Sequence, residues 1–358
     1  LNPLKDKIAL IGIGVNDKKS GWNCFLFDQL DHDFTKILRP LLESKKTYKL
    51  GHNFKFDWSF LWYQTGIDCQ PILDTMLAAI VCEYGTMQEK GRWGLAALSL
   101  EKLGRQMDKD EELRTSFKGA PYTERQIHYA ASDLVQTGEL WNSYAPSLSD
   151  HFDIVKLECD IIPAVGSIEL AGMKVDMKKL KVLVEQANLA KKVLEKSLPI
   201  VSLTRGTASL GPNTEEKRLN PNSHKQIKEY FRESFGIELK DTSEKTLKQI
   251  EADGARALAD LILKCKANKK LIGTYLKKLD PDSLREDERI RGRFFSMGAR
   301  TGRFSVQGIL QTIPRQQEIR ELFVPEIGNC YVIADYSQIE LRVSAELSGD
   351  KTMQDAFV

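Results

Sequence analysis

Asp335, near the end of the sequence, follows an apolar run at a position where an enzyme could use its carboxylate to bind a metal ion. Residues 331–334 are apolar, Asp335 follows at once, and polar and apolar residues then recur at helical spacing. This pattern predicts a buried strand that ends in a carboxylate, followed by a helix whose first turns carry Gln338, Glu340 and Arg342. A carboxylate at the tip of a strand can hold Mg²⁺ against a phosphate group. An ordinary turn capped by Asp and Ser would have the same local pattern.

A second set of candidate catalytic residues lies in the first 150 residues. Asn53 and Asp57 are four residues apart near a predicted strand-to-helix junction, and Tyr129 and Asp133 have the same spacing on a predicted helix. Phosphodiester hydrolysis with two metal ions needs several clustered carboxylates and a group that orients the attacking water. Asp57 and Asp133 can bind metal, and Tyr129 can orient or deprotonate the water. Taken singly, each pair is also typical of a surface or a helix cap.

The segments around these residues predict an α/β region that gives way to helices. Apolar runs at 8–14, 24–27 and 48–51 predict strands, and residues 34–42 predict a helix between them. Further helices are predicted at 124–144, 152–170, 178–198, 224–235 and 243–279.

The connecting segments predict where this organisation changes. Residues 145–150 are rich in turn formers, and the polar run 280–289 marks a second boundary. Residues 202–222, rich in Thr, Gly, Pro and Asn, predict an exposed loop. Short strands and loops are expected to return from residue 291 onward.

The composition is that of a soluble globular protein. The chain has 358 residues, of which 42% are hydrophobic and 28% charged, which allows two or three domains. No apolar run approaches the roughly 20 residues of a membrane helix, and the first residues lack the pattern of a secretory signal. The six cysteines and five histidines are dispersed without a C-x-x-C pair. This favours reduced thiols in a cytosolic protein over a zinc site.

The charge is distributed unevenly along the chain. Residues 174–278 contain 23 Lys and Arg against 13 Asp and Glu, whereas residues 1–150 contain 18 against 20. A basic region beside acidic ones suits the binding of a polyanion such as nucleic acid. A solvated, Lys-rich helical surface would have the same balance, so charge alone leaves both interpretations open.

Longer strings around these residues resemble one polymerase family. Residues 332–342 resemble the first palm motif of family A DNA polymerases, the bacterial DNA polymerase I type, and residues 344–350 continue the resemblance. Residues 296–305 contain Thr301 and Arg303 and resemble the family's Thr-Gly-Arg motif, whose Arg contacts the primer–template near the active site. An arginine offers a fork of donors that suits a phosphate or the edge of a base.

This resemblance implies roles for the residues of the opening motif. Asp335 would bind both metal ions, and the backbone carbonyl of Tyr336 would complete a metal shell. Glu340 would be the gate that occupies the place of a ribonucleotide's 2′-hydroxyl. Gln338 and Arg342 would support the site and contact DNA. Taken locally, Glu340 and Arg342 would be an exposed charge pair within a helix.

Two segments of the basic region resemble the thumb of the same family. Residues 219–227 resemble its Asn-x-Asn-Ser segment, and residues 270–276 resemble its Lys-Leu-x-x-Thr-Tyr segment. The resemblance implies that the thumb holds the duplex by its backbone, through Asn220, Asn222, Ser223 and Lys270. A plain helix cap at Ser223 in front of a Lys-coated helix is the alternative.

The N-terminal acids resemble those of a proofreading 3′→5′ exonuclease of the DEDD type, Tyr variety. The match extends over residues 51–57, 73–77, 93–98 and 129–133, and it implies catalytic or metal-binding roles for Asp57, Tyr129 and Asp133. The family's first motif, an Asp-x-Glu on the first strand, is not found between residues 1 and 53. We therefore expect the 358-residue polypeptide to be severely impaired as an exonuclease.

The resemblance covers residues 1–358 and implies an internal piece of a family A DNA polymerase. It predicts an α/β ribonuclease H-like exonuclease domain at 1–148, a mainly helical thumb at 149–290 and the start of an α+β palm at 291–358. The second palm carboxylate and the fingers follow later in the family, so templated synthesis by this polypeptide is not expected either.

The same resemblance implies a cofactor and partners. These are Mg²⁺, with Mn²⁺ as a substitute, a DNA primer–template, a single-stranded 3′ end and deoxynucleoside triphosphates. It further implies a monomer without a membrane partner, in the cytoplasm of a bacterium or encoded by a phage, with an organellar origin left open.

Two other functions are compatible with parts of the sequence. The first is a stand-alone exonuclease of the ribonuclease D kind with a helical nucleic-acid module. The Thr-Gly-Arg and Asp-Tyr-Ser-Gln-Ile-Glu strings argue against it, because such an enzyme has no use for a deoxynucleotide gate. The second is a non-catalytic DNA-binding protein that keeps the basic thumb.

Overall fold

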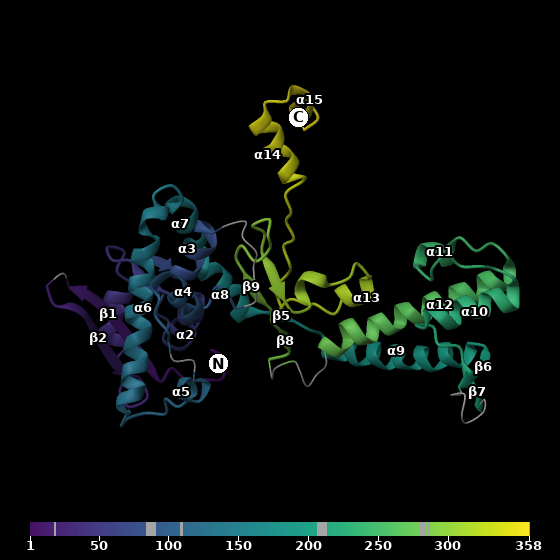
Figure 1. Ribbon diagram of the computed structural model, residues 1–358, viewed down its shortest axis with the longest axis horizontal. Coiled ribbons are helices and arrows are strands. Elements are labelled where there is room, and N and C mark those ends of the chain that lie inside the picture. The colour runs from purple at the N-terminus through teal and green to yellow at the C-terminus, as the bar shows by residue number, and fades with distance from the viewer. Residues whose placement is uncertain are drawn as a thin grey trace.

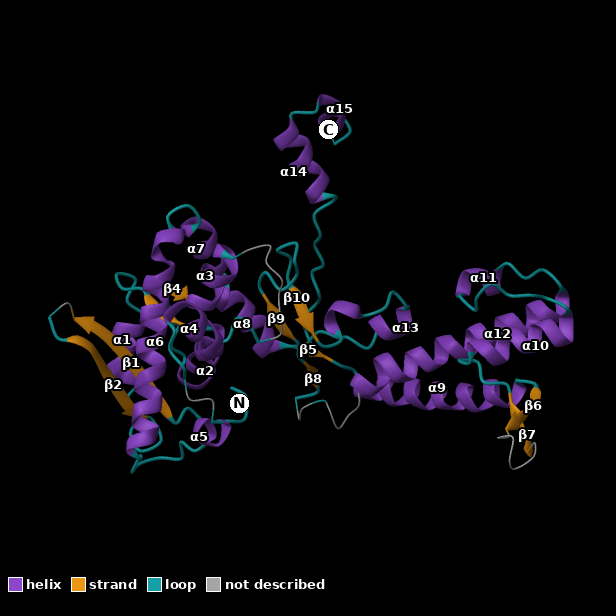
Figure 2. Cartoon of the chain, viewed as in Figure 1, coloured by secondary structure: helices purple, strands orange, loops and turns teal. Residues whose placement is uncertain are grey.

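The computed structural model describes residues 1–17, 19–83, 91–107, 110–205, 213–279, 284 and 287–357. Figure 1 shows a body built from the N-terminal residues, a central junction of short strands, a long helical arm and a helical segment that projects from the junction near the C-terminus. Helices make up most of the body and of the arm (Figure 2). Over these described ranges, no helix is long and apolar enough to cross a membrane.

The body combines two pairs of strands with surrounding helices. β1 (Leu10–Asp17) pairs antiparallel with β2 (Gly21–Asp28), and β3 (Lys49–Gly51) pairs parallel with β4 (Ile72–Asp74). The helices are α1 (Thr35–Leu42), α2 (Lys55–Thr65), α3 (Thr75–Cys82), α4 (Leu95–Leu103), α5 (Glu111–Thr115), α6 (Glu124–Leu148), α7 (Phe152–Asp160) and α8 (Ile162–Ala171). The predicted strands, the helix at 34–42 and the α/β class of this region are confirmed.

Helix α6 packs against both strand pairs. It begins with a capping box, in which the Thr123 hydroxyl accepts from the Gln126 N–H and the Gln126 side chain accepts from the Thr123 N–H. The helix contacts β1, β2, β3, α3 and α4, and Leu140 is buried in the core that it shares with them. On β2, the indole of Trp22 donates to Glu139 at 2.7 Å.

The arm consists of helices, and the two longest of them, α9 and α12, run side by side (Figure 1). The helices of the arm are α9 (Met177–Ser197), α10 (His224–Phe235), α11 (Glu244–Lys248) and α12 (Asp253–Lys270). A π-helical turn, Leu271–Tyr275, and a 3-10 turn, Leu276–Leu279, return the chain to the junction. Asp176 caps α9 and Ser223 caps α10, each by accepting from backbone N–H groups of the first turn. The predicted helical character of this region is confirmed.

Two predicted long helices are each interrupted. The helix predicted at 152–170 breaks at Ile161, because Pro163 lacks the N–H that a continuous helix would bond to the Cys159 carbonyl and its ring crowds that carbonyl. The helix predicted at 243–279 breaks after α11, where the Arg256 guanidinium donates to the carbonyls of Lys248 and Ile250 at 2.8 and 3.3 Å. This arginine satisfies carbonyl groups that a continuous helix would have used.

The exposed loop predicted at 202–222 is partly wrong. β6 (Ile200–Arg205) and β7 (Asn213–Arg218) form an antiparallel hairpin there, and residues 206–212 between them lie outside the described residues. Pairing between the strands satisfies backbone groups that a loop would leave to water. The boundary predicted at 280–289 also falls largely outside the described residues.

The junction connects the body to the arm through short strands. β5 (Met173–Lys174) pairs with β8 (Arg289–Ile290), and β9 (Arg293–Phe295) pairs with β10 (Ser305–Gln307). The ammonium of Lys55 forms an ion pair with Glu169 at 2.5 Å and donates to the backbone carbonyl of Phe294, which ties α2, α8 and β9 together. The short strands and loops predicted from residue 291 onward are therefore confirmed. The domain boundaries at 148 and 290 stay a prediction.

The strand predicted at 331–334 is wrong. Residues 329–336 form no regular element, and the side chains of Val332 and Ile333 are 89% and 91% exposed. A strand needs a neighbour for its N–H and C=O groups, and none of the described strands pairs with this segment. The remaining C-terminal elements are a 3-10 turn, Leu310–Thr312, and the helices α13 (Gln317–Arg320), α14 (Ile339–Ser348) and α15 (Lys351–Asp355).

The contact between α6 and β2 predicts the effect of a small substitution. A Cβ atom at Gly138 would lie 1.9 Å from the Trp22 ring. We expect Gly138→Ala to destabilise the body by about 1–3 kcal/mol, although alanine favours a helix, because the ring must move. The urea midpoint followed by tryptophan fluorescence measures this change.

Gly254→Ala is the matched control, because a Cβ there meets only Phe235, at 3.4 Å. This second substitution should be neutral or stabilising. Equal midpoints for the two variants would contradict the packing described for Trp22.

Candidate functional site

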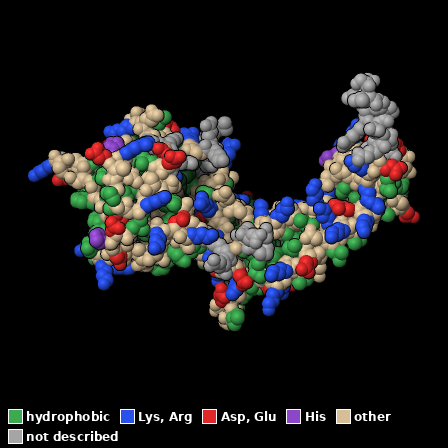
Figure 3. Space-filling model, turned by 90° about the horizontal axis from the view of Figure 1, so that it is seen from below, with side chains coloured by type: hydrophobic (Ala, Val, Ile, Leu, Met, Phe, Trp, Pro, Cys, Tyr) green, Lys and Arg blue, Asp and Glu red, His purple; other side chains and the backbone are tan. Residues whose placement is uncertain are grey.

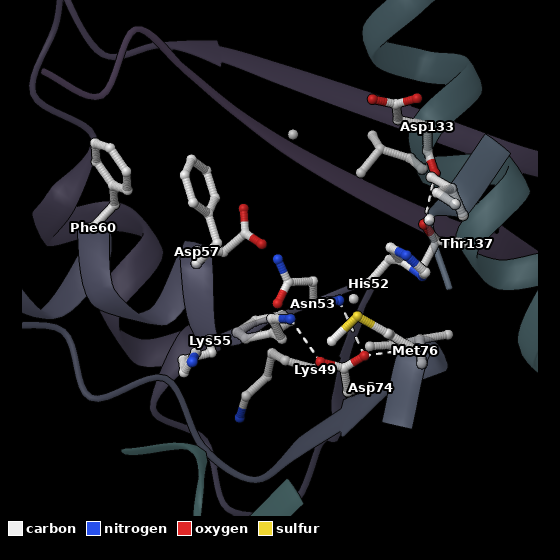
Figure 4. A pocket seen from close by; sticks show the side chains of 18 of the residues that line it. Lys49, His52, Asn53, Lys55, Asp57, Phe60, Asp74, Met76, Asp133 and Thr137 are labelled. Atoms are coloured by element: carbon white, nitrogen blue, oxygen red, sulfur yellow. Dashed lines mark hydrogen bonds between the residues drawn. The ribbon is translucent and has the colours of Figure 1, made fainter. Parts of the chain in front are cut away.

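A cavity of 1420 Å³ in the body collects the N-terminal residues singled out in the sequence. Asn53, Asp57, Tyr129 and Asp133 all line it. Figure 4 shows Asp57 on α2 and Asp133 on α6 on opposite sides of the space, with Asn53 between them. The fold therefore brings together two motifs that are more than 70 residues apart in the sequence.

The carboxylates of Asp57 and Asp133 favour the protonated form more than usual. The surrounding protein raises the pKa of Asp57 to about 7, mainly by burial and further through the charges of Asp74 and Asp133. Asp57 is nevertheless exposed at the cavity, and a hydrogen bond from its own backbone N–H opposes the rise in its pKa. Burial raises the pKa of Asp133 to about 6, and the charge of Arg114 opposes that shift. Tyr129, one turn before Asp133, packs its ring near Phe117 at 6.4 Å.

Asp74 holds the turn that presents Asn53 and Asp57. Its side chain is 1% exposed and accepts hydrogen bonds from the N–H groups of Asn53 at 3.0 Å, Phe54 at 2.7 Å and Met76 at 2.8 Å. Asn53 has a φ of 55°, a left-handed conformation that Asn tolerates better than most residues. The carboxylate thus fixes the β3–α2 turn to the β4–α3 turn.

Sequence reasoning did not single out Asp74. The sequence does contain a signal for a structural role of this residue, because an Asp at the end of a predicted strand and before a helix is a preferred N-cap. That signal reports only the bond to the helix that follows, and the bonds to Asn53 and Phe54 depend on how two distant turns meet. His52 has a similar supporting place, with its Nδ1 atom 2.9 Å from the Thr75 hydroxyl oxygen.

The described residues do not gather a set of metal ligands. Over the described part of the chain, no group of three or more His, Cys, Asp or Glu side chains could hold a metal ion. Asp57 and Asp133 supply oxygen donors of the kind that Mg²⁺ prefers, but two carboxylates fall short of a site for two ions. The metal-binding roles assigned to Asp57, Asp133, Asp335 and Tyr336 remain predictions.

The C-terminal candidates lie outside this cavity. Asp335 and Tyr336 are on the irregular, exposed segment, and the Tyr336 side chain is 79% exposed. The interpretation of Asp335 as the tip of a buried strand is therefore wrong. Gln338 has a φ of 50° at the N-cap of α14, so the helix begins directly after a left-handed residue.

The structure brings two of the palm candidates together. Arg303 and Glu340, 37 residues apart, form an exposed ion pair. Thr301 is exposed in the same β9–β10 loop, where Gly302 has a φ of 75°. Arg342 donates to the carbonyls of Ser337 at 2.9 Å and Phe357 at 3.1 Å, so its guanidinium supports the α14–α15 turn.

The thumb candidates lie at the start of α10. The Ser223 hydroxyl accepts from the Gln226 N–H at 3.3 Å, and the Asn220 side chain accepts from the Asn222 N–H at 3.0 Å. These bonds form a helix cap, which is the structural role weighed for Ser223 above. Asn220, Asn222 and Lys270 are exposed, so their side chains are accessible to a partner.

Comparison with known families covers most of the chain in two blocks. Residues 1–149 match the 3′-5′ exonuclease family, and residues 207–358 match DNA polymerase family A. The chain belongs to family A of the DNA polymerases. A stand-alone exonuclease would not account for the polymerase match over residues 207–358.

Relatives with known names are DNA polymerases from bacteria and a phage. The chain is 28% identical to DNA polymerase I of Aquifex aeolicus, over 98% of this chain and 60% of the relative. It is 30% identical to DNA polymerase I of Chloroflexus aurantiacus, over 89% and 35%. It is 26% identical to the DNA polymerase of Escherichia phage T5, over 98% and 44%. The chain thus spans 35–60% of the length of these relatives.

One solved structure shares the fold along the chain. It is the POL domain of Pol1 from M. smegmatis in complex with a DNA primer-template and dNTP, with a TM-score of 0.68 and 21% identity. The similarity covers 99% of this chain and 62% of that one. The predicted fold, an α/β exonuclease domain followed by a helical thumb and part of a palm, is confirmed.

Asp74 provides a test of the cavity's architecture. We expect Asp74→Asn to destabilise the body by about 3 kcal/mol, because an amide nitrogen would replace an acceptor that faces buried N–H groups. The urea midpoint measures the loss. Asp150→Asn, in the exposed turn after α6, is the control and should stay within about 0.5 kcal/mol of the parent. Equal effects at both positions would refute the role of Asp74.

The raised pKa of Asp57 predicts a dependence of stability on pH. Between its ordinary pKa and about 7, the folded chain binds more protons at Asp57 than the unfolded chain does. The free energy of unfolding therefore falls as the pH rises through this window.

Asp57→Asn removes this effect, so the variant should gain stability relative to the parent at pH 8 and not at pH 4. Urea unfolding in EDTA at both pH values measures the difference. An equal gain in the free energy of unfolding at both pH values would mean that the folded chain does not disfavour the charged form of Asp57.

Proposed function

We propose that this chain works as part of a family A DNA polymerase that carries 3′→5′ proofreading. The reaction is templated addition of deoxynucleotides, with removal of mispaired 3′ ends by the exonuclease domain. One observation carries the proposal, namely that exonuclease and polymerase family matches follow one another on a single chain. Its substrates are a primer–template, a single-stranded 3′ end and deoxynucleoside triphosphates. We further propose a monomer in the cytoplasm of a bacterium or of a phage-infected cell, the location being supported by the bacterial and phage origin of the named relatives.

The arm is the part of the chain best suited to hold duplex DNA. Lys178, Lys181, Lys192 and Lys196 are exposed on α9, and their spacing places them on one side of the helix. Figure 3 shows Lys and Arg side chains along the arm. Such side chains contact phosphates and position a duplex without reading its sequence.

The metal implied by the family is Mg²⁺, for which Mn²⁺ could substitute. Asp57 and Asp133 would hold it in the body, and Asp335 with the Tyr336 carbonyl would hold it in the palm. The set of described ligands is too small for a two-metal reaction. What its residues do is bind and orient: the arm holds the duplex, and Arg303 lies on the loop nearest to Glu340.

The arm predicts a salt-dependent affinity for DNA. Replacing Lys178, Lys181, Lys192 and Lys196 by Gln should weaken binding of a primer–template duplex at least about tenfold. The slope of log K against log salt should also flatten by about 0.9 for each phosphate that the variant no longer neutralises. Fluorescence anisotropy at several salt concentrations measures both quantities. Lys45→Gln with Lys46→Gln, two exposed lysines of the body, is the control and should leave affinity unchanged.

The incomplete metal set predicts binding without chemistry. With Mg²⁺ or Mn²⁺ present, we expect the 358-residue polypeptide neither to extend a primer nor to degrade single-stranded DNA above the level of an Asp57→Asn, Asp335→Asn double variant. Gel assays with labelled primers measure both activities. Synthesis or cleavage that is lost in the double variant would show that these carboxylates already suffice.

A further inference from the structure

The backbone of Phe294 on β9 is hydrogen-bonded to two side chains of the body. Its N–H donates to Glu169 on α8 at 2.5 Å, and its carbonyl accepts from the ammonium of Lys55 on α2. Backbone groups in an antiparallel pair point alternately toward and away from the partner strand, and those of Phe294 point away from β10. The Lys55–Glu169 ion pair therefore occupies the place that a further strand of this sheet would take.

This ion pair is largely withdrawn from solvent. The Lys55 and Glu169 side chains are each 18% exposed, and the ammonium also lies 5.4 Å from the centre of the Phe295 ring. A charge in such a place is stabilised by its partners more than by water, so removing one member leaves the other unpaired. Lys55 therefore holds β9 in one position against α2 and α8.

Met297, in the loop that follows β9, attaches the hairpin to the body a second time. Its side chain is 9% exposed and belongs to the hydrophobic core of the body. Its φ is 50°, a left-handed conformation that residues other than Gly and Asn seldom adopt. Such a conformation persists only where the surrounding structure enforces it, and it is found most often at functional sites. The burial of this side chain thus offsets an unfavourable backbone conformation.

The loop between β9 and β10 is closed on itself by backbone hydrogen bonds. The Gly302 N–H donates to the Ala299 carbonyl at 3.0 Å, and the Ala299 N–H donates to the Arg303 carbonyl at 3.1 Å. A Cβ atom at Gly298 would lie 2.1 Å from the Ser305 hydroxyl oxygen, so the two sides of the loop are in close contact. The position of Arg303 therefore follows the position of β9.

We propose that Lys55 is a positioning residue for the binding of DNA by Arg303. Together with Glu169, the ammonium fixes the backbone of Phe294, which lies 239 residues further along the sequence, and the hairpin then fixes the guanidinium that contacts a primer–template. The body is thus the platform of a DNA-binding loop, a role that does not depend on its carboxylates Asp57 and Asp133. This inference rests on the proposed function, because it takes Arg303 as a contact to DNA.

A double-mutant cycle tests this role. Fluorescence anisotropy measures the affinity of the 358-residue chain for a labelled primer–template duplex, with and without Arg303→Gln, in the parent and in Lys55→Met. We expect Arg303→Gln to weaken binding about tenfold in the parent and less than about threefold in Lys55→Met, because a guanidinium that is already out of place contributes little. A general loss of stability in Lys55→Met would leave the two ratios equal.

Lys156→Met is the matched control for this cycle. Lys156 forms an ion pair with Asp160 on the same helix, α7, so the substitution removes an equal charge from the body at a pair that lies within one element. Arg303→Gln should weaken binding about tenfold in this background as well. Equal ratios in all three backgrounds, or no effect of Arg303→Gln in the parent, would overturn the proposal.

Hydrogen exchange tests the positioning without DNA and so separates this inference from the proposed function. Amides of residues 294–303 should exchange at least about tenfold faster in Lys55→Met than in the parent, while those of α6 keep their rates. Unchanged rates over residues 294–303, or an equal increase along the whole body, would overturn the proposal. A parent chain that binds no duplex would contradict the proposed function, and the exchange rates would still decide whether Lys55 fixes the hairpin.

Glu169→Gln takes the place of Lys55→Met if that variant does not fold. It keeps an oxygen for the Phe294 N–H and removes the charge that pairs with Lys55. We expect the effect of Arg303→Gln to shrink in this background too, and the amides of residues 294–303 to exchange faster. A folded Glu169→Gln variant with the parent's ratio and the parent's exchange rates would count against the role of the ion pair.

Discussion

The packing of helix α6 across two separate strand pairs is the constraint on which the rest of the body depends. The helix contacts β1, β2, β3, α3 and α4, and its own first turn is secured by the capping box at Thr123. Because the two strand pairs do not hydrogen-bond to each other, the helix surface sets their distance. The same helix carries Tyr129 and Asp133, so the position of these candidate catalytic groups relative to Asp57 follows from that packing.

Asp74 has a comparable role on the other side of the cavity. A buried carboxylate that accepts several backbone N–H groups needs no cation to be stable, because the donors solvate it. Asp57 lacks such a shell, and its pKa is raised to about 7. Two aspartates on adjacent turns thus have opposite surroundings, one suited to holding the backbone and the other to meeting a proton or a ligand.

Local patterns predicted the elements of this chain well where they are amphipathic and capped. The strands of the body, α6 and α9 follow from periodicity, and the pairing of Asn53–Asp57 with Tyr129–Asp133 in one cavity follows from the family resemblance. The strand at 331–334 was predicted wrongly because an apolar run reports only that a segment would be buried beside a partner. The bonds of Asp74 to Asn53 and Phe54 were out of reach, because they arise only when two turns meet in space.

The exposed segment around Val332 and Ile333 has a consequence for how the polypeptide behaves in solution. It is extended, strongly apolar and unpaired with any described strand. Segments of this kind act as templates for the same segment of another molecule, which pairs edge to edge and excludes water from both. Self-association of the isolated chain is therefore favoured at its palm-like end, and the acid at Asp335 is the nearest charge that opposes it.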